Sequence, residues 1–303
     1  MKKILLLILC LSLSGIMPGL AAARVNAVAT TAELADWTRQ IGGDRVSVTA
    51  ISTGGFDLHF FEPSPSHIMT LRDADLLVIA GMDLDVWVRE LIDASRNRDI
   101  RFGRRGFVDA SDGVMALDVP ETVDAGMGHV HPQGNPHYWF TPDNVKTVVN
   151  NIYEGLARVS PGNRDYFRAN RDSYLEEVEA KFEELKSRME PFRGTKILQY
   201  HETWEYFAKT FGLEIFDALE PLPGIPPSAR HLRELVSEVR GEDVRLLIAE
   251  PYYPDRPVNF VRRQLPGVRV LRLPHYMGAR RGVNTYLEHL EYLVNEVAGA
   301  LEG

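Results

Sequence analysis

Strand-like and helix-like hydrophobic patterns alternate along the chain from residue 25 onward. Short apolar runs predict buried strands, and longer stretches with apolar residues at i, i+3 and i+4 predict helices. In the N-terminal half, the predicted strands are 25–28, 46–51, 75–80 and 107–110, and the predicted helices are 31–41, 65–72, 84–94 and 141–157. In the C-terminal half, the predicted strands are 196–200, 213–218, 244–249 and 268–273, and the predicted helices are 203–211, 228–240, 257–264 and 284–301. Because strands that alternate with helices of this length form βαβ units, each half is expected to build a parallel sheet.

One stretch between the two halves is predicted to be a single long helix. Residues 163–190 contain neither Gly nor Pro, and apolar residues recur at helical spacing from Tyr174 to Met189. At a rise of about 1.5 Å per residue, such a helix is about 40 Å long. A helix of that length in a compact protein predicts a strut between two lobes. The alternative is a pair of helices broken near Ser173.

These patterns together predict an α/β protein of two lobes. Each lobe is expected to be a parallel sheet flanked by helices, and one long rigid helix joins them. The expected boundaries are 24–162 for the N-terminal lobe, 163–190 for the linking helix and 191–303 for the C-terminal lobe. A length of 303 residues agrees with two domains of ordinary size.

The first residues are predicted to be a cleavable signal peptide rather than part of the fold. Lys2 and Lys3 precede an apolar run at 4–13, and three alanines at 21–23 supply small residues for cleavage. The apolar run is too short to span a bilayer comfortably, which argues against the alternative of an uncleaved anchor helix. We therefore expect residues 1–23 to be removed and the protein to be periplasmic.

Composition and charge narrow the classes of function. The chain is 45% hydrophobic and 25% charged, an ordinary globular mixture, and its formal net charge is −8. Because an acidic protein repels phosphate backbones, we expect no nucleic acid partner. The single cysteine, Cys10, excludes a disulfide framework and a cysteine-rich metal site. Cys10 follows Leu9, whereas a lipoprotein signal requires a small residue before the cysteine, so we expect no lipid anchor. We also expect the protein to be a monomer.

Histidines and one glutamate lie where ligands bind in parallel α/β sheets, just beyond the carboxyl ends of the strands. In the C-terminal half, His201 and Glu250 directly follow predicted strands, and His275 follows the last strand after one proline. In the N-terminal half, His59 lies in the loop after the second strand, and His137 precedes a predicted helix start. Neutral imidazole is a ligand for zinc, copper, iron and nickel, so two ligands from each lobe predict a metal between the lobes.

Each of these residues also has a simpler interpretation. A single histidine at a strand end is often a surface or capping residue, and Glu250 alone is able to anchor a backbone amide or an arginine. His129 and His131, in a Gly-rich loop, form a candidate auxiliary metal pair or belong to a solvated loop. The remaining histidines fall on predicted helices and are interpreted as structural or surface residues: His67, His231 and His289.

Three segments around these histidines resemble the zinc/manganese class of solute-binding proteins that serve ABC-type metal importers. Residues 55–66 (GFDLHFFEPSPS) resemble the first-ligand motif of that family, which ends in Glu-Pro-(Ser/Thr)-Pro. Residues 135–144 (NPHYWFTPDN) are similar to its Asp-Pro-His motif. Residues 201–213, which begin with a histidine, resemble its third-ligand segment. The resemblance covers essentially the whole chain after the leader.

The resemblance implies that His59, His137 and His201 are the first three metal ligands. A histidine at the third position is similar to the zinc binders of the family, whereas many manganese binders carry a carboxylate there. The chain departs from the family at the fourth ligand, because the loop after the last strand contains no aspartate. His275 is the expected substitute, and Glu250 or a water molecule is the alternative.

The function implied by the resemblance is a periplasmic receptor, not an enzyme, that captures a metal ion between its lobes. The receptor then delivers the ion to the membrane permease of an ABC importer. Zn²⁺ is the expected transported ion, and Mn²⁺ or iron is the alternative. The rival from another class is a secreted zinc-dependent hydrolase, because residues 201–205 (HETWE) begin like His-Glu-x-x-His. Their last residue is Glu, so the two-histidine helical site is incomplete.

Overall fold

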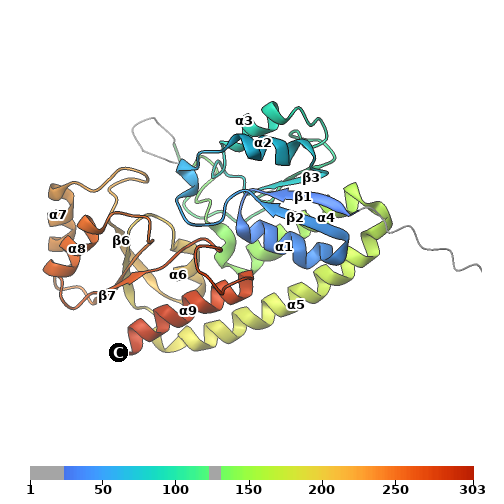
Figure 1. Cartoon of the computed structure of the whole chain (residues 1–303). Helices are drawn as coiled ribbons and strands as arrows, with labels where there is room; N and C mark the ends of the chain where they lie inside the picture. The colour runs from blue at the N-terminus through green and yellow to red at the C-terminus, as the bar shows by residue number, and fades with distance from the viewer. Residues whose placement is uncertain (1–23, 123–130) are drawn as a thin grey trace, which may run out of the picture.

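A computed structural model describes residues 24–122 and 131–303 as two lobes, each built on a four-stranded parallel sheet (Figure 1). The strand order of the first sheet is β2-β1-β3-β4, and all of its neighbouring strands are parallel. Its strands are β1 (Val25–Ala29), β2 (Val46–Ala50), β3 (Leu76–Ile79) and β4 (Phe107–Asp109). The predicted fold class is thereby confirmed for this lobe.

The second sheet repeats the arrangement of the first. Its order is β6-β5-β7-β8, again with all pairs parallel. Its strands are β5 (Lys196–Gln199), β6 (Glu214–Ala218), β7 (Val244–Ala249) and β8 (Arg269–Arg272). In both sheets the carboxyl ends of the strands meet at one edge, which is the edge that carries the histidines.

Helices cover the sheets at nearly the predicted positions. In the first lobe they are α1 (Ala32–Gly42), α2 (Pro65–Arg72), α3 (Val88–Ser95) and α4 (Pro142–Val159). In the second lobe they are α6 (Glu205–Phe211), α7 (Ala229–Val239), α8 (Asp255–Gln264) and α9 (Tyr286–Glu302). The largest difference is the start of α3, which was predicted at residue 84. Met82 and Asp83 have φ of 49° and 58°, so the chain turns through left-handed conformations before the helix begins.

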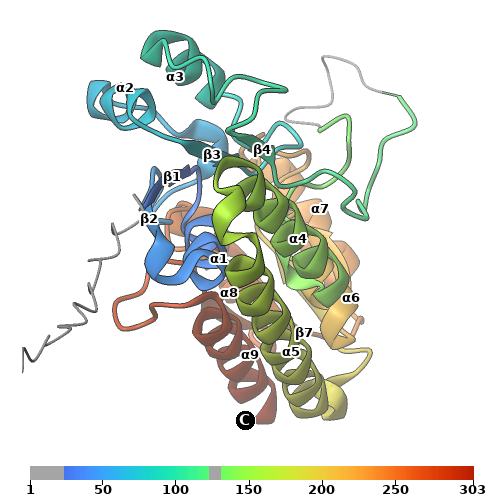
Figure 2. The same ribbon diagram turned by 90° about the vertical axis from the view of Figure 1, so that its right-hand side faces the viewer.

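The predicted strut is one unbroken helix, α5 (Arg164–Met189), and no break occurs near Ser173. It packs against α1 and α4 in the first lobe and against α6 and α9 in the second, so it runs beneath both lobes (Figures 1 and 2). The side chains at its predicted apolar spacing are buried: Tyr174, Val178, Phe182, Leu185 and Met189. None of the helices in the described parts of the chain is long and apolar enough to cross a membrane.

Phe182 is expected to be a main anchor of this strut. Its side chain is fully buried on α5, and its ring stacks on Phe211 of α6 at 6.2 Å and 7°. Replacing it with alanine is expected to lower the free energy of unfolding by about 3–5 kcal/mol, the usual cost of removing a buried phenylalanine. Chemical denaturation measures the loss, and Glu179→Ala on the exposed face of α5 is the matched control. A loss below about 1 kcal/mol would contradict the tight packing of the strut.

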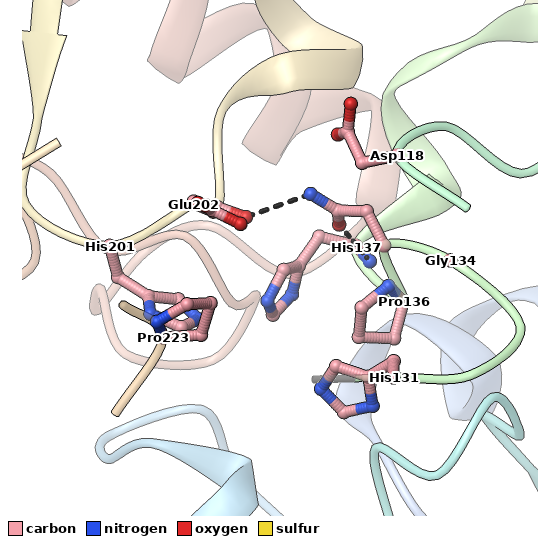
Figure 3. A pocket seen from close by; sticks show the side chains of 9 residues that line it. Asp118, His131, Gly134, Pro136, His137, His201, Glu202 and Pro223 are labelled. Atoms are coloured by element: carbon pink, nitrogen blue, oxygen red, sulfur yellow. Dashed lines mark hydrogen bonds between the residues drawn. The ribbon is translucent and has the colours of Figure 1, made fainter. Parts of the chain in front are cut away.

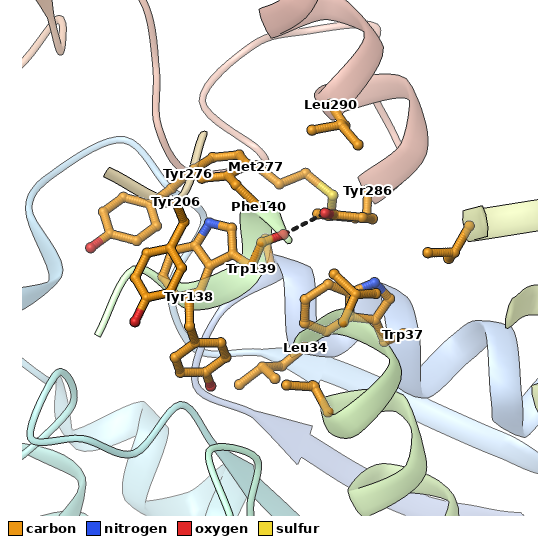
Figure 4. Packing of buried hydrophobic residues seen from close by; sticks show 14 of the residues in the cluster. Leu34, Trp37, Tyr138, Trp139, Phe140, Tyr206, Tyr276, Met277, Tyr286 and Leu290 are labelled. Atoms are coloured by element: carbon orange, nitrogen blue, oxygen red, sulfur yellow. Dashed lines mark hydrogen bonds between the residues drawn. The ribbon is translucent and has the colours of Figure 1, made fainter. Parts of the chain in front are cut away.

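The first lobe also holds a segment of the second lobe directly (Figure 4). Glu33 on α1 accepts a hydrogen bond from the Met277 backbone N–H at 2.6 Å, and Asp36 accepts one from the Tyr286 N–H at 2.8 Å. The Tyr286 hydroxyl donates to the backbone oxygen of Trp139. These contacts fix the loop after β8, which contains His275, the predicted fourth ligand.

Glu33 makes this contact pH-sensitive. Burial raises the pKa of its carboxyl to about 7, although the Met277 amide opposes the rise. A raised pKa means that the folded state binds the proton more tightly, so the stability from this group is full at low pH and is lost as pH rises through 7. Between pH 5 and pH 8 we expect Glu33 to account for a decrease of about 3 kcal/mol in the free energy of unfolding.

Glu33→Gln is expected to flatten this pH dependence, because the amide keeps an acceptor for Met277 and carries no proton to lose. Denaturation curves at pH 5 and pH 8 measure the effect, with Glu176→Gln on the exposed face of α5 as the control. An unchanged pH dependence in Glu33→Gln would show that the carboxyl is ionised throughout this range.

Candidate metal centre

Three of the predicted histidines meet between the lobes. His59 lies in the 3₁₀ turn Leu58–Phe60 after β2, His137 precedes the turn Tyr138–Phe140, and His201 lies two residues beyond β5. One ring nitrogen from each lies within 4.8 Å of the other two. The centroids of these rings are 5.4–5.7 Å apart. Both lobes thus contribute donors to one point, as the strand ends predicted.

Asp57 orients His59. Its carboxylate accepts hydrogen bonds from the His59 backbone N–H at 3.0 Å and from ring Nδ1 at 2.7 Å. Burial alone raises the pKa of Asp57, but the hydrogen bond and charge of His59 outweigh it and lower the pKa to about 2. Because Nδ1 donates to this carboxylate, Nε2 is the nitrogen that faces the other histidines. A carboxylate behind a ligand histidine is the usual way to fix its tautomer.

Glu220 orients His201 in the same way. The ring Nδ1 of His201 lies 2.8 Å from a Glu220 oxygen, and both side chains are buried. Burial lowers the pKa of His201, but the hydrogen bond and charge of Glu220 outweigh it, and the pKa rises to about 9. The same Glu220 oxygen accepts the Gly224 N–H at 2.9 Å, which ties the loop after β6 to the site.

His137 is a buried imidazole whose ring nitrogens have no hydrogen-bond partner among the described residues. Burial and the neighbouring histidines hold its pKa well below the usual value, so the ring is neutral. Asn135 fixes its backbone by accepting the His137 N–H at 3.0 Å, and its side-chain amide donates to the Glu202 carbonyl in the other lobe. Buried polar atoms are normally satisfied, so two orphaned nitrogens at this point fit an ion.

His275 lies next to this group in a fully buried aromatic environment. Its ring centroid is 4.8 Å from that of His137, and Trp139 and Phe140 pack on it at 5.1 Å. His289 holds the His275 carbonyl through Nε2 at 3.1 Å, which gives His289 the structural role expected of it. Neither ring nitrogen of His275 has a partner among the described residues. His275 is nevertheless outside the group of three whose nitrogens lie within 4.8 Å.

Glu250, the alternative fourth ligand, is also fully buried. One carboxylate oxygen accepts from the Trp204 indole N–H at 3.1 Å, and the other has no partner among the described residues. Burial raises the pKa of Glu250 to about 8, although the charge of His201 opposes the rise. At neutral pH the group is therefore largely protonated in the metal-free protein.

His131 lies beside the three histidines, whereas His129 is outside the described residues. The Nε2 atoms of His131 and His59 are 2.9 Å apart. His131, His137 and His201 line one pocket, with Asp118 and Glu202 at its border (Figure 3). The described member of the predicted auxiliary pair is thus brought to the site.

A family profile described as "Zinc-uptake complex component A periplasmic" (ZnuA) matches residues 27–300. The chain belongs to the ZnuA family. This confirms the family indicated by the histidine motifs, and ZnuA proteins are solute-binding components of metal transport rather than enzymes.

Relatives of this ZnuA-family chain differ in the metal that their names give. The chain is 25% identical to the "Iron-binding protein YfeA" of Yersinia pestis, over 93% of this chain and 88% of that protein. It is also 25% identical to the "Manganese ABC transporter substrate-binding lipoprotein PsaA" of Streptococcus anginosus, over 86% of each chain. A crystal structure of ZnuA has the same fold, with a TM-score of 0.77, 24% identity and coverage of 91% of this chain and 99% of that one.

Sequence reasoning missed two residues of this ZnuA-family site, Asp57 and Glu220. Glu220 lies two residues beyond β6, so the strand-end rule that pointed to His201 also reaches it. Asp57 lies two residues before His59, at the N-cap of the same turn. Both signals were present in the sequence, but carboxylates at turns have many structural roles, and only the geometry separates these two from the rest.

Proposed function

We propose that the protein is a periplasmic zinc receptor that holds Zn²⁺ through His59, His137 and His201 and delivers it to an ABC-type permease. The observation that carries this proposal is the convergence of three imidazole nitrogens within 4.8 Å, two of whose rings are fixed from behind by carboxylates. Oriented imidazoles with outer carboxylates are the usual surroundings of zinc in proteins. Because both lobes supply ligands, binding of the ion depends on the relative position of the lobes.

The donor set favours zinc over manganese. The three donor atoms that converge in the described part of the chain are all imidazole nitrogens, whereas Mn²⁺ prefers carboxylate, carbonyl and water oxygens. Asp57 and Glu220 are engaged with the outer nitrogens of the histidines, so they act on the charge of the site rather than as inner ligands. Iron also accepts imidazole, and competition between Zn²⁺, Mn²⁺ and Fe²⁺ in one titration tests the preference.

We propose His275 as the fourth ligand, with Glu250 as the alternative. Its orphaned nitrogens and its ring contact with His137 support the role, and its ring has to move closer to the other two histidines to share their ion. His275→Ala is expected to lower zinc affinity by more than tenfold, and Glu250→Ala by less, in a competitive titration with a chelator. A tenfold or smaller loss in His275→Ala, together with a much larger loss in Glu250→Ala, would transfer the role to the carboxylate.

The proposal also includes export to the periplasm and the absence of catalytic activity. The leader at residues 1–23 supports a periplasmic location, and the N-terminal residue of the protein recovered from the periplasm is expected to be Arg24. The hydrolase alternative rests on residues 201–205, whose last residue, Glu205, is half-buried and accepts hydrogen bonds from Gln199 and Asn135. Peptidase and esterase assays on the zinc-loaded protein are expected to show no turnover above buffer.

A further inference from the structure

The segment between α3 and β4 carries a basic surface in an otherwise acidic protein. Residues 96–105 (RNRDIRFGRR) hold five arginines against the single carboxylate of Asp99, whereas the whole chain has a net charge of −8. All five arginines are exposed. We call residues 96–105 the arginine segment. It follows α3, which lies at one extremity of the molecule in both ribbon views (Figures 1 and 2).

Most of this charge is uncompensated within the described part of the chain. No ion pair within 4 Å joins Arg96, Arg98, Arg101 or Arg104 to a described carboxylate. Arg105 differs, because its guanidinium donates to the carbonyls of residues 158 and 159 at the end of α4. Four guanidinium groups therefore remain available for an outside partner.

The backbone of the arginine segment is fixed rather than free. The side chain of Asn97 donates to the carbonyl of Leu71 in the last turn of α2 at 3.0 Å and to that of Ala74, just beyond the helix, at 2.7 Å. Backbone hydrogen bonds join Gly106 to Asp99 at 2.8 Å and Arg104 to Arg101 at 2.9 Å. The arginines are thus presented from a structured loop, which lowers the entropic cost of contacting a surface together.

An exposed aromatic ring stands among these arginines. Phe102 is 51% exposed, and its ring rests on Phe107 at 4.6 Å with the Arg89 guanidinium 5.9 Å from its centre. An aromatic ring next to basic side chains with long apolar stems is the composition that binds the interface of a bilayer. A purely acidic protein partner would use the arginines and leave Phe102 in water.

We propose that the arginine segment is a docking surface for anionic phospholipid headgroups. This rests on the proposed function in one respect only, that a receptor of a membrane importer works beside a bilayer. Guanidinium groups pair with lipid phosphates, and Phe102 enters the boundary between headgroups and acyl chains. Removing one arginine near an anionic surface weakens binding by about fivefold, so three removals weaken it by about 100-fold.

The location of the arginine segment leaves the metal centre open. The arginine segment leads into the amino end of β4, which runs parallel to its neighbour β3. His59, in contrast, lies beyond the carboxyl end of β2. The two features therefore occupy opposite edges of the same sheet. A molecule held on lipid through the arginine segment keeps the mouth of the metal centre accessible for capture.

Co-sedimentation with vesicles tests the proposal. The exported protein, without residues 1–23, is mixed with vesicles of phosphatidylcholine alone or with about 30% phosphatidylglycerol, at about 50 mM and about 200 mM salt. We expect binding to the anionic vesicles only, and weaker binding at the higher salt. The triple variant Arg98→Gln, Arg101→Gln, Arg104→Gln is expected to lose about 100-fold in partitioning, and Phe102→Ala to lose part of the binding.

The matched control removes three exposed arginines from the other lobe, Arg233→Gln, Arg262→Gln and Arg263→Gln, and is expected to bind like the wild type. Equal losses in the two triple variants would show that only net charge matters, which overturns the proposal. So would the absence of binding to anionic vesicles, and binding to polyglutamate instead would assign the surface to an acidic protein. A zinc titration separates the two proposals: vesicle binding without zinc binding refutes the proposed zinc site and leaves the lipid surface standing.

Discussion

Replacing His59, His137 or His201 with alanine is expected to lower zinc affinity by more than about 100-fold. Loss of a residue that only orients a ligand costs about 10–100-fold, and the loss of a ligand itself exceeds that range. The three variants should behave alike because their nitrogens meet at one point, within 4.8 Å. Competition with a chelator of known affinity measures the change.

Two histidines outside the site provide matched controls. His67 bonds to Ser64 at the start of α2, and His231 lies on α7. His67→Ala and His231→Ala are expected to leave zinc affinity unchanged. Thermal unfolding of each variant separates a loss of binding from a loss of the fold. Losses below tenfold in all three site variants would show that the ion binds elsewhere.

Zinc affinity is expected to fall about 100-fold between pH 8 and pH 6. Glu220 raises the pKa of His201 to about 9 despite burial, so this ring is protonated in the metal-free protein over the whole range. Because zinc binds the neutral imidazole, binding has to release that proton, and affinity falls about tenfold for each unit of pH. His137 is already neutral and adds no competition, since its pKa lies well below the usual value.

Calorimetry in buffers of different ionisation enthalpy measures the protons directly. At least one proton, that of His201, is expected to leave the protein for each zinc bound at pH 7. Glu220→Gln removes the charge that raises the pKa of His201, and its proton release is expected to fall well below that of the wild type. A zinc affinity that is constant from pH 8 to pH 6, or equal proton release in the two proteins, would contradict the assigned pair.

The architecture was predictable because strands buried in a parallel sheet have continuous apolar sequences. Residues 76–79 and 246–249 show this, and the structure has strands there. The long helix was predictable from the spacing of its buried residues, although its packing partners were not. The start of α3 was missed, because the left-handed conformations of Met82 and Asp83 leave no mark in the hydrophobic pattern.

The candidate site was predictable where it depends on local topology. The strand-end rule pointed to His201 and Glu250 because the carboxyl ends of parallel strands share one edge. The surroundings of His275 were not predictable in this way. They depend on Trp139 from the other lobe and on Glu33, which holds the loop that follows His275. Contacts of this kind arise only when the lobes are packed against each other.

Anomalous X-ray diffraction at the zinc absorption edge, on crystals of the zinc-loaded protein, tests the central claim most directly. The account predicts one strong anomalous peak between the lobes, about 2.0–2.1 Å from one imidazole nitrogen each of His59, His137 and His201. The nitrogens at that distance are expected to be those not bonded to Asp57 and Glu220. A peak away from these three rings, or none after equilibration with zinc at neutral pH, would contradict the account.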